Sequence, residues 1–162
     1  GGGAPASALG VDNAFGAALE RAGGAGLNAT TSHDATSYFV SLPANQLELW
    51  FALESERFRS PAFRGVYGEK GVIEEERRLR VENSRFGRFV EAFNAAAFGP
   101  ESPYGWPVIG WKDDFDSLGR REVAAFFGER YGPESLVVAV CGDADPGEVR
   151  RLAEKYFGGW RG

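Results

Sequence analysis

Glu69 and Glu76 lie seven residues apart in a segment whose pattern predicts a helix over residues 65–82. Seven residues are about two helical turns, so both carboxylates face the same side, roughly 10 Å apart along the axis. The apolar residues of that side are Val72, Ile73 and Leu79. A carboxylate in an apolar stripe must be ion-paired, hydrogen-bonded or bound to a metal, because burying it alone costs too much free energy. Whatever fold this chain adopts, it must bring a partner group to these acids.

A second interpretation of the same helix is an exposed, self-neutralised surface. Glu74, Glu75 and Glu76 are consecutive and point around the helix, and three arginines follow at Arg77, Arg78 and Arg80. Acids and bases in this order commonly form solvated ion pairs. On charge pattern alone this alternative stays open, and only Glu69 and Glu76 share the apolar stripe.

Composition bounds the possible partners and compartments. The chain has 162 residues, of which 43% are hydrophobic, enough for one domain with its own core. Its net charge of -5 argues against nucleic acid or an anionic membrane surface as a partner, and no apolar run is long enough to span a bilayer. We therefore expect a soluble protein whose compartment is unknown, since no targeting segment is visible.

The two ends of the chain differ in kind. Residues 1–12 are rich in Gly and Ala and are expected to be a flexible linker or the ragged end of a longer chain. Residues 13–160 are expected to form the folded part. Its lone cysteine, Cys141, excludes an internal disulfide and lies in the apolar run 136–141, so we expect a buried structural thiol.

The pattern of elements predicts an α+β domain, with helices on one face of a mostly antiparallel sheet. Strand-like segments at 27–31 and 36–42 flank a polar turn and predict a hairpin, and the apolar run 136–141 predicts a strand buried on both faces. Asn45 with Glu48, and Asp145 before Pro146, are typical of helix starts. The expected helices are 13–22, 45–58, 65–82, 86–98, 120–131 and 146–157, with a structured loop at 99–107.

Motifs for other chemistries are missing. His33 is the single histidine and is expected in the exposed turn of the hairpin, where one imidazole cannot make a two-histidine metal site. The sequence contains no Gly-x-Ser-x-Gly elbow and no phosphate-binding glycine motif.

Five blocks in order resemble the pitrilysin/insulinase family of zinc metallopeptidases, which includes the mitochondrial processing peptidases. The blocks are Gly26-Leu27-Asn28-Ala29-Thr30-Thr31-Ser32-His33-Asp34-Ala35-Thr36-Ser37-Tyr38-Phe39, Leu42-Pro43-Ala44-Asn45-Gln46-Leu47-Glu48-Leu49-Trp50, Leu53-Glu54-Ser55-Glu56-Arg57, residues 69–78, and Pro103-Tyr104-Gly105-Trp106-Pro107-Val108-Ile109-Gly110-Trp111. The tail from Cys141 to Gly158 is also similar. The resemblance covers residues 13–158 and implies the fold of one incomplete repeat domain of that family.

The resemblance implies a role for each matching position. Glu76 takes the place of the third zinc ligand, and Glu69 that of an acid supporting the metal site from outside its ligand shell. Asn28, Ala29 and Thr30 match the edge strand to which a peptide substrate adds by backbone pairing. The family's inverted motif H-x-x-E-H supplies two further ligands and the general-base glutamate. This chain lacks that motif, so no catalytic residue is assigned within it and the base is expected upstream.

Three hypotheses remain. The chain is the downstream part of a zinc endopeptidase acting on extended or unfolded peptides, inactive alone and completed by an upstream segment and a second related domain or subunit. Keeping Glu69 and Glu76 favours this hypothesis, because without a metal the two acids only cost stability. The alternative is a non-catalytic scaffold or assembly subunit of the same family. The third is a plain peptide-binding module that uses only the edge strand.

Overall fold

The computed structural model describes residues 14–63, 65–115 and 117–161. They divide into two compact units. Unit 1 contains residues 28–38 and the segment from 65 to 120, whereas unit 2 contains residues 14–27, 39–63 and 121–161. The predicted linker at 1–12 lies outside the described residues.

In the described part of the chain the β-sheet consists of one two-stranded antiparallel hairpin. Strand β1 spans Ala25–Thr31 and β2 spans Thr36–Ser41, close to the predicted bounds. The turn is closed by the Ser32 amide, which donates to the Ala35 carbonyl oxygen at 2.9 Å. The hydroxyl groups of Thr31 and Thr36 lie 3.2 Å apart across the strands. The predicted hairpin is therefore confirmed.

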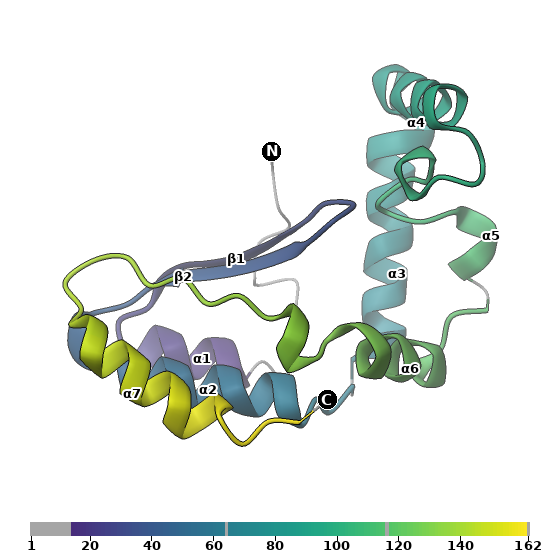
Figure 1. The fold of residues 1–162 in the computed structure, drawn as a ribbon. Coiled ribbons are helices and arrows are strands. Elements are labelled where there is room, and N and C mark those ends of the chain that lie inside the picture. Colours follow the sequence, from purple (N-terminus) through teal and green to yellow (C-terminus); the bar gives the residue numbers. More distant parts are fainter. Residues whose placement is uncertain (1–13, 64, 116, 162) are drawn as a thin grey trace. The chain divides into compact units, whose positions relative to one another are not determined.

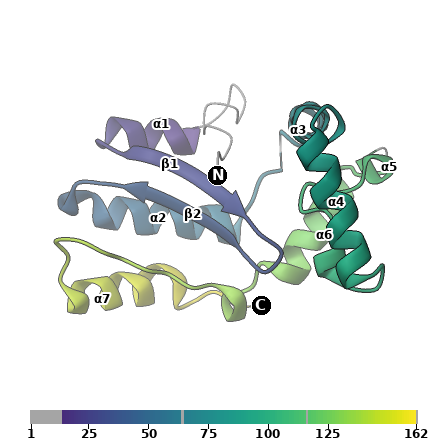
Figure 2. The same cartoon turned by 90° about the horizontal axis from the view of Figure 1, so that it is seen from above.

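Unit 2 contains three helices on one side of the hairpin residues that belong to this unit, 25–27 and 39–41 (Figures 1 and 2). They are α1 (Ala14–Arg21), α2 (Leu47–Arg59) and α7 (Pro146–Phe157). Each contributes one fully buried side chain, Leu19, Phe51 and Leu152 respectively. Helix α2 packs on α7, where the rings of Phe51 and Phe157 meet edge to face at 6.2 Å. Helix α6 (Arg120–Arg130) leads into this unit.

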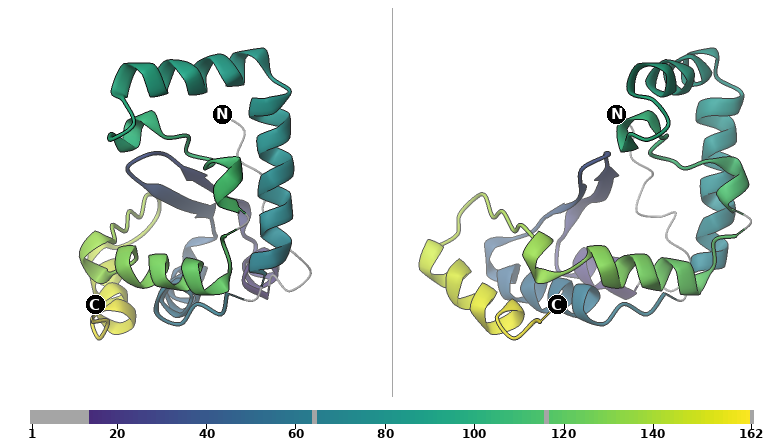
Figure 3. Two further views of the ribbon diagram at one scale, coloured as in Figure 1. Left: turned by 90° about the vertical axis from the view of Figure 1, so that its right-hand side faces the viewer. Right: turned by 45° about the vertical axis from the view of Figure 1, so that its right-hand side comes forward.

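Unit 1 is built on two helices joined by a π turn. Helix α3 spans Val66–Arg77, the π turn η3 spans Arg78–Glu82 and α4 spans Arg85–Phe98. Ser84 caps α4 by accepting a hydrogen bond from the Gly87 amide at 3.0 Å. Helix α4 crosses the end of α3 (Figure 3), and Gly87 permits this approach because a β-carbon there would overlap the Arg80 carbonyl oxygen. The short turn η4 (Pro103–Gly105) and helix α5 (Lys112–Phe115) complete the unit.

The predicted strand at 136–141 is wrong for the described residues. This segment follows the 3-10 turn η5 (Pro133–Ser135) and is not part of the sheet. Val137 is 88% exposed and Cys141 is also exposed, so the expected buried thiol is wrong too. An apolar run becomes a buried strand only when neighbouring strands take up its backbone hydrogen bonds, and the described sheet consists of β1 and β2 alone. The α+β class holds, but in this part of the chain the predicted sheet is reduced to one hairpin.

One of the two predicted helix caps forms. The Asp145 carboxylate accepts from the Glu148 amide at 2.8 Å at the start of α7. The capping box of Asn45 and Glu48 is wrong, because α2 begins at Leu47 after the 3-10 turn η2 (Ala44–Gln46) and has no side-chain cap. Glu48 instead accepts hydrogen bonds from Lys155 Nζ at 2.7 Å and Tyr156 Oη at 3.0 Å on α7. These hydrogen bonds, with that of Lys155 first, lower the pKa of the Glu48 carboxyl.

Candidate functional site

Strand β1 presents an open backbone edge at the three predicted substrate-binding positions. The sheet order is β1-β2, so within the described residues β1 has no neighbour on its other side. The Ala29 amide donates to the Asn28 side-chain oxygen at 2.8 Å. Thr30 is exposed, while Asn28 and Ala29 are half-buried. An open edge of this kind can accept a further strand through main-chain hydrogen bonds.

Helix α3 carries both predicted acidic positions. Glu69 and Glu76 are half-buried and lie two turns apart. Arg80 Nη1 lies 2.7 Å from Glu76 Oε1, and Arg78 makes a separate pair with Glu75 at 2.6 Å. Glu75 therefore forms the exposed ion pair that the alternative describes, whereas Glu76 is ion-paired but half-buried.

The apolar stripe of α3 is not a core in this structure. Val72, Ile73 and Leu79 are 40%, 38% and 59% exposed. The prediction that this side of the helix packs into a core is wrong within the described residues, because all three side chains are exposed rather than buried. The buried residue of α3 is Arg77.

The sequence pattern groups Arg77 with the exposed arginines, but its side chain is buried in unit 1. Its guanidinium forks onto Glu91 of α4, with Nη1 to Oε2 at 2.9 Å and Nη2 to Oε1 at 3.1 Å. Nη1 also donates to the Gly110 carbonyl oxygen at 2.8 Å. The sequence carries no local signal that separates Arg77 from Arg78 and Arg80, because all three follow the same run of acids.

The hairpin tip is attached to the loop that follows α4. His33 Nε2 lies 3.0 Å from the Trp106 carbonyl oxygen, and the Tyr104 hydroxyl donates to Asp34 Oδ1 at 2.7 Å. The hydrogen bond to the Asp34 carboxylate and its negative charge raise the pKa of Tyr104. His33 is exposed as predicted, but its ring also stands 5.4 Å from that of Tyr104.

An apolar hollow of about 350 Å³ lies in unit 1 beside these contacts. Its walls come from the π turn, α4, the loop after η4 and the hairpin tip. The lining residues are His33, Arg80, Val81, Phe86, Gly87, Val90, Glu91, Asn94, Trp106, Pro107, Val108 and Ile109. Arg80, the partner of Glu76, therefore also borders this hollow.

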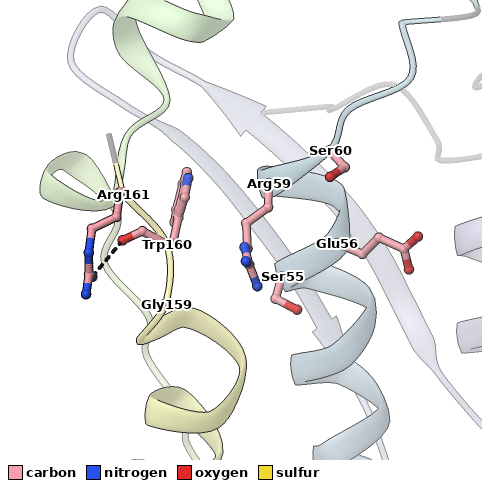
Figure 4. A pocket seen from close by; sticks show the side chains of 7 residues that line it. All are labelled: Ser55, Glu56, Arg59, Ser60, Gly159, Trp160 and Arg161. Carbon is pink, nitrogen blue, oxygen red and sulfur yellow. Dashed lines mark hydrogen bonds between the residues drawn. The ribbon is translucent and has the colours of Figure 1, made fainter.

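A larger and more polar hollow of about 510 Å³ lies in unit 2, at the C-terminal ends of α2 and α7 (Figure 4). Its lining includes Arg59 and Trp160, and Arg161, which donates to the Trp160 carbonyl oxygen at 3.3 Å. None of the predicted site residues lines it. Size alone therefore does not mark the functional site.

The residues present do not make a zinc site by themselves. Across residues 14–63, 65–115 and 117–161, no three His, Cys, Asp or Glu side chains are grouped so as to hold a metal ion. Glu76 is engaged by Arg80, whereas zinc in proteins takes three or four protein ligands. No helix of the described part is both long and apolar enough to cross a membrane.

Comparison with known families decides the lineage. The model of the insulinase family, peptidase family M16, matches residues 10–101, which is more than half of the chain. The chain belongs to the insulinase family. The model described as the peptidase M16 inactive domain matches residues 117–162. The resemblance deduced from the ordered sequence blocks is thereby confirmed.

Insulinase-family relatives extend well beyond the length of this chain. Over 141 residues the chain is 32% identical to zinc protease PqqE of Helicobacter pylori, covering 86% of this chain and 31% of that protein. It is 27% identical to the mitochondrial-processing peptidase subunit beta of Blastocladiella emersonii, covering 86% and 30%. The crystal structure of a protease from Helicobacter pylori matches with a TM-score of 0.81 at 30% identity, covering 91% of this chain and 36% of that one. The chain thus spans about a third of the relatives it matches.

Proposed function

We propose that this chain is the downstream part of the catalytic domain of a zinc metalloendopeptidase that hydrolyses peptide bonds in extended or unfolded peptides. In this proposal it supplies the third zinc ligand, Glu76, and the edge strand that binds substrate, and it is inactive by itself. The observation that carries the proposal is the insulinase-family match over residues 10–101, which includes both β1 and α3. Relatives over this stretch bear the name zinc protease.

The free edge of β1 supports the substrate-binding part of the proposal. Main-chain hydrogen bonds from residues 28–30 would hold an extended peptide with little dependence on its sequence. In the free chain the Asn28 side chain covers the Ala29 amide. Strand addition would exchange this local hydrogen bond for one to the peptide backbone, so the cost of binding is small.

The half-buried carboxylate of Glu76 supports its assignment as a ligand. Both partners of its ion pair with Arg80 are partly exposed: the Arg80 side chain is 55% exposed and that of Glu76 is 26% exposed. Such pairs contribute little to stability, so a metal ion could displace the arginine readily. The remaining zinc ligands would come from a segment upstream of this chain. A second, related domain or subunit would complete the enzyme. Glu69, two turns away, would support the metal site without binding the metal.

The test uses the complete open reading frame that encodes this chain. If the frame carries an H-x-x-E-H motif, its product should cleave unfolded peptides, and a chelator should stop the cleavage. Glu76→Gln should abolish cleavage and lower zinc content, whereas the matched control Glu75→Gln should leave both unchanged. Full activity and zinc content in Glu76→Gln would overturn the ligand assignment.

A non-catalytic scaffold or assembly subunit is the second candidate. The match of residues 117–162 to the model described as the peptidase M16 inactive domain is the reason for considering it. A complete reading frame without H-x-x-E-H, whose product co-purifies with a catalytic relative, would decide for it.

A further inference from the structure

The buried residue of helix α3 in unit 1 is an arginine rather than an apolar residue. A surface helix normally fixes its rotation by burying an apolar stripe. In α3 the stripe residues Val72 and Ile73 are 40% and 38% exposed, and the residue of this helix that is buried is Arg77. Its side chain is only 7% exposed, against 58% for Arg78 and 55% for Arg80.

The contacts of Arg77 join three separate segments of unit 1. The two-pronged pair with Glu91 ties α3 to α4, and the hydrogen bond to the Gly110 carbonyl oxygen ties it to the turn before α5. A fork of this kind fixes direction as well as distance, because the guanidinium is planar and both of its terminal nitrogens are engaged. The third nitrogen, Nε, is buried without a hydrogen-bond partner and lies 3.9 Å from Glu82 Oε1. Gly110 has a φ of +85°, so the turn that presents this carbonyl has a backbone conformation that favours glycine.

Arg77, which makes these contacts, directly follows Glu76 in the sequence. Successive residues of a helix are about 100° apart, so fixing Arg77 toward the interior fixes the direction in which Glu76 leaves the helix. The π turn η3 begins at the next residue, and the Asn83 amide bonds to the Arg78 carbonyl oxygen at 2.8 Å. The helix therefore changes its winding immediately after the adjacent residues Glu76 and Arg77. Such π turns within helices are frequent at functional sites.

We infer that Arg77 is a positioning residue for Glu76, acting through Glu91 and Gly110. The inference rests on the proposed role of Glu76 as a zinc ligand. In this role the guanidinium contacts Glu91 and Gly110 and would bind neither the metal nor the substrate. It sets the rotation of α3, and so decides where the Glu76 carboxylate stands when the remaining ligands are supplied.

The first arm of the test uses the 162-residue chain. Arg77→Lys keeps the charge but loses the fork, and amide exchange across residues 73–83 and at Gly110 should rise at least tenfold. The exposed control Arg78→Lys should change exchange by less than twofold. An unchanged exchange pattern in Arg77→Lys, or an equal rise in every element of the chain, would show that the contacts of Arg77 do not hold α3 in a fixed rotation.

The second arm measures zinc affinity in the product of the complete reading frame, at a temperature where circular dichroism shows every variant to be folded. Arg77→Lys should weaken zinc binding about 10- to 100-fold, as is usual when support outside the ligand shell is removed. Glu91→Gln should weaken it as well, and the double variant should lose less than the two single losses combined, because both changes break one contact. If the folded Arg77→Lys variant binds zinc with wild-type affinity, Arg77 has only a structural role and the inference is wrong. If Glu76→Gln itself leaves zinc affinity unchanged, the proposed function fails instead, so the two failures are distinguishable.

Discussion

Tyr104 and Asp34 are 70 residues apart in the sequence, yet the Tyr104 hydroxyl donates to Asp34 Oδ1 at 2.7 Å. With the contact of His33 to the Trp106 carbonyl oxygen, this bond holds the hairpin tip against the loop after α4. The outer part of β1, which includes the predicted substrate-binding positions, is thereby anchored at its far end within unit 1.

Removing that hydroxyl should loosen the hairpin tip. Tyr104→Phe keeps the ring contacts to His33 and Phe98 at 5.4 and 5.8 Å and deletes only the hydrogen bond. Amide exchange over residues 32–36 should rise roughly threefold to tenfold, because one hydrogen bond of ordinary strength is lost. Tyr67→Phe, on a side chain that is 72% exposed, is the control. Unchanged exchange in Tyr104→Phe would show that the ring contacts alone hold the tip.

The core of unit 2 should depend strongly on Phe51. This side chain is fully buried and faces Phe157 of α7. Phe51→Ala should lower the free energy of unfolding by about 3–5 kcal/mol, through lost apolar burial and the cavity left behind. Urea unfolding followed by circular dichroism measures the loss. Phe89→Ala, at a side chain that is 62% exposed, should cost far less, and similar losses in the two variants would contradict this account of the core.

Glu54 should make the stability of unit 2 depend on pH. The residue is 4% exposed, and Arg57 Nε and Nη2 donate to its Oε2 at 2.9 and 2.5 Å. Burial raises the pKa of the Glu54 carboxyl, and the attraction of Arg57 offsets this only in part. The folded chain therefore holds this proton at a higher pH than the unfolded chain does. The stabilising contribution is fully present below the unfolded pKa of about 4 and is lost as pH rises through the folded pKa.

Glu54→Gln removes this titration. The stability of the variant relative to the parent should therefore increase from pH 4 to pH 7, as measured by urea unfolding at both values. Glu56→Gln, on the same helix and exposed, provides the matched control. A relative stability of Glu54→Gln that falls between pH 4 and pH 7 would mean that the Arg57 pair outweighs burial.

The isolated chain should bind zinc weakly and cleave nothing. One or two carboxylates are a poor zinc site, so titration calorimetry should give a dissociation constant weaker than about 100 µM. Glu76→Gln should abolish even this weak binding, and Glu101→Gln serves as the control. Tight binding of one zinc ion per chain would contradict the conclusion that the site is incomplete.

Local sequence patterns determined much of this protein. The hairpin, the Asp145 cap and the helices near 14–21, 66–77, 85–98, 120–130 and 146–157 follow from periodicity and turn chemistry within a few residues. The five ordered blocks were also enough to indicate the insulinase family. Each of these signals depends on residues close together in the chain, which is why the sequence alone carries them.

The tertiary structure decided what those local signals leave open. Residues 136–141 are apolar enough for a buried strand, but whether a strand forms depends on neighbours that the segment itself does not encode. Glu48 has the spacing of a capping box, yet Lys155 on another helix provides it with a charged partner. Arg77 and Arg78 are adjacent in an acidic helix, and only the arrival of Glu91 and the Gly110 carbonyl makes Arg77 the buried one. Burying a charge requires partners in fixed positions, and only the folded chain supplies them.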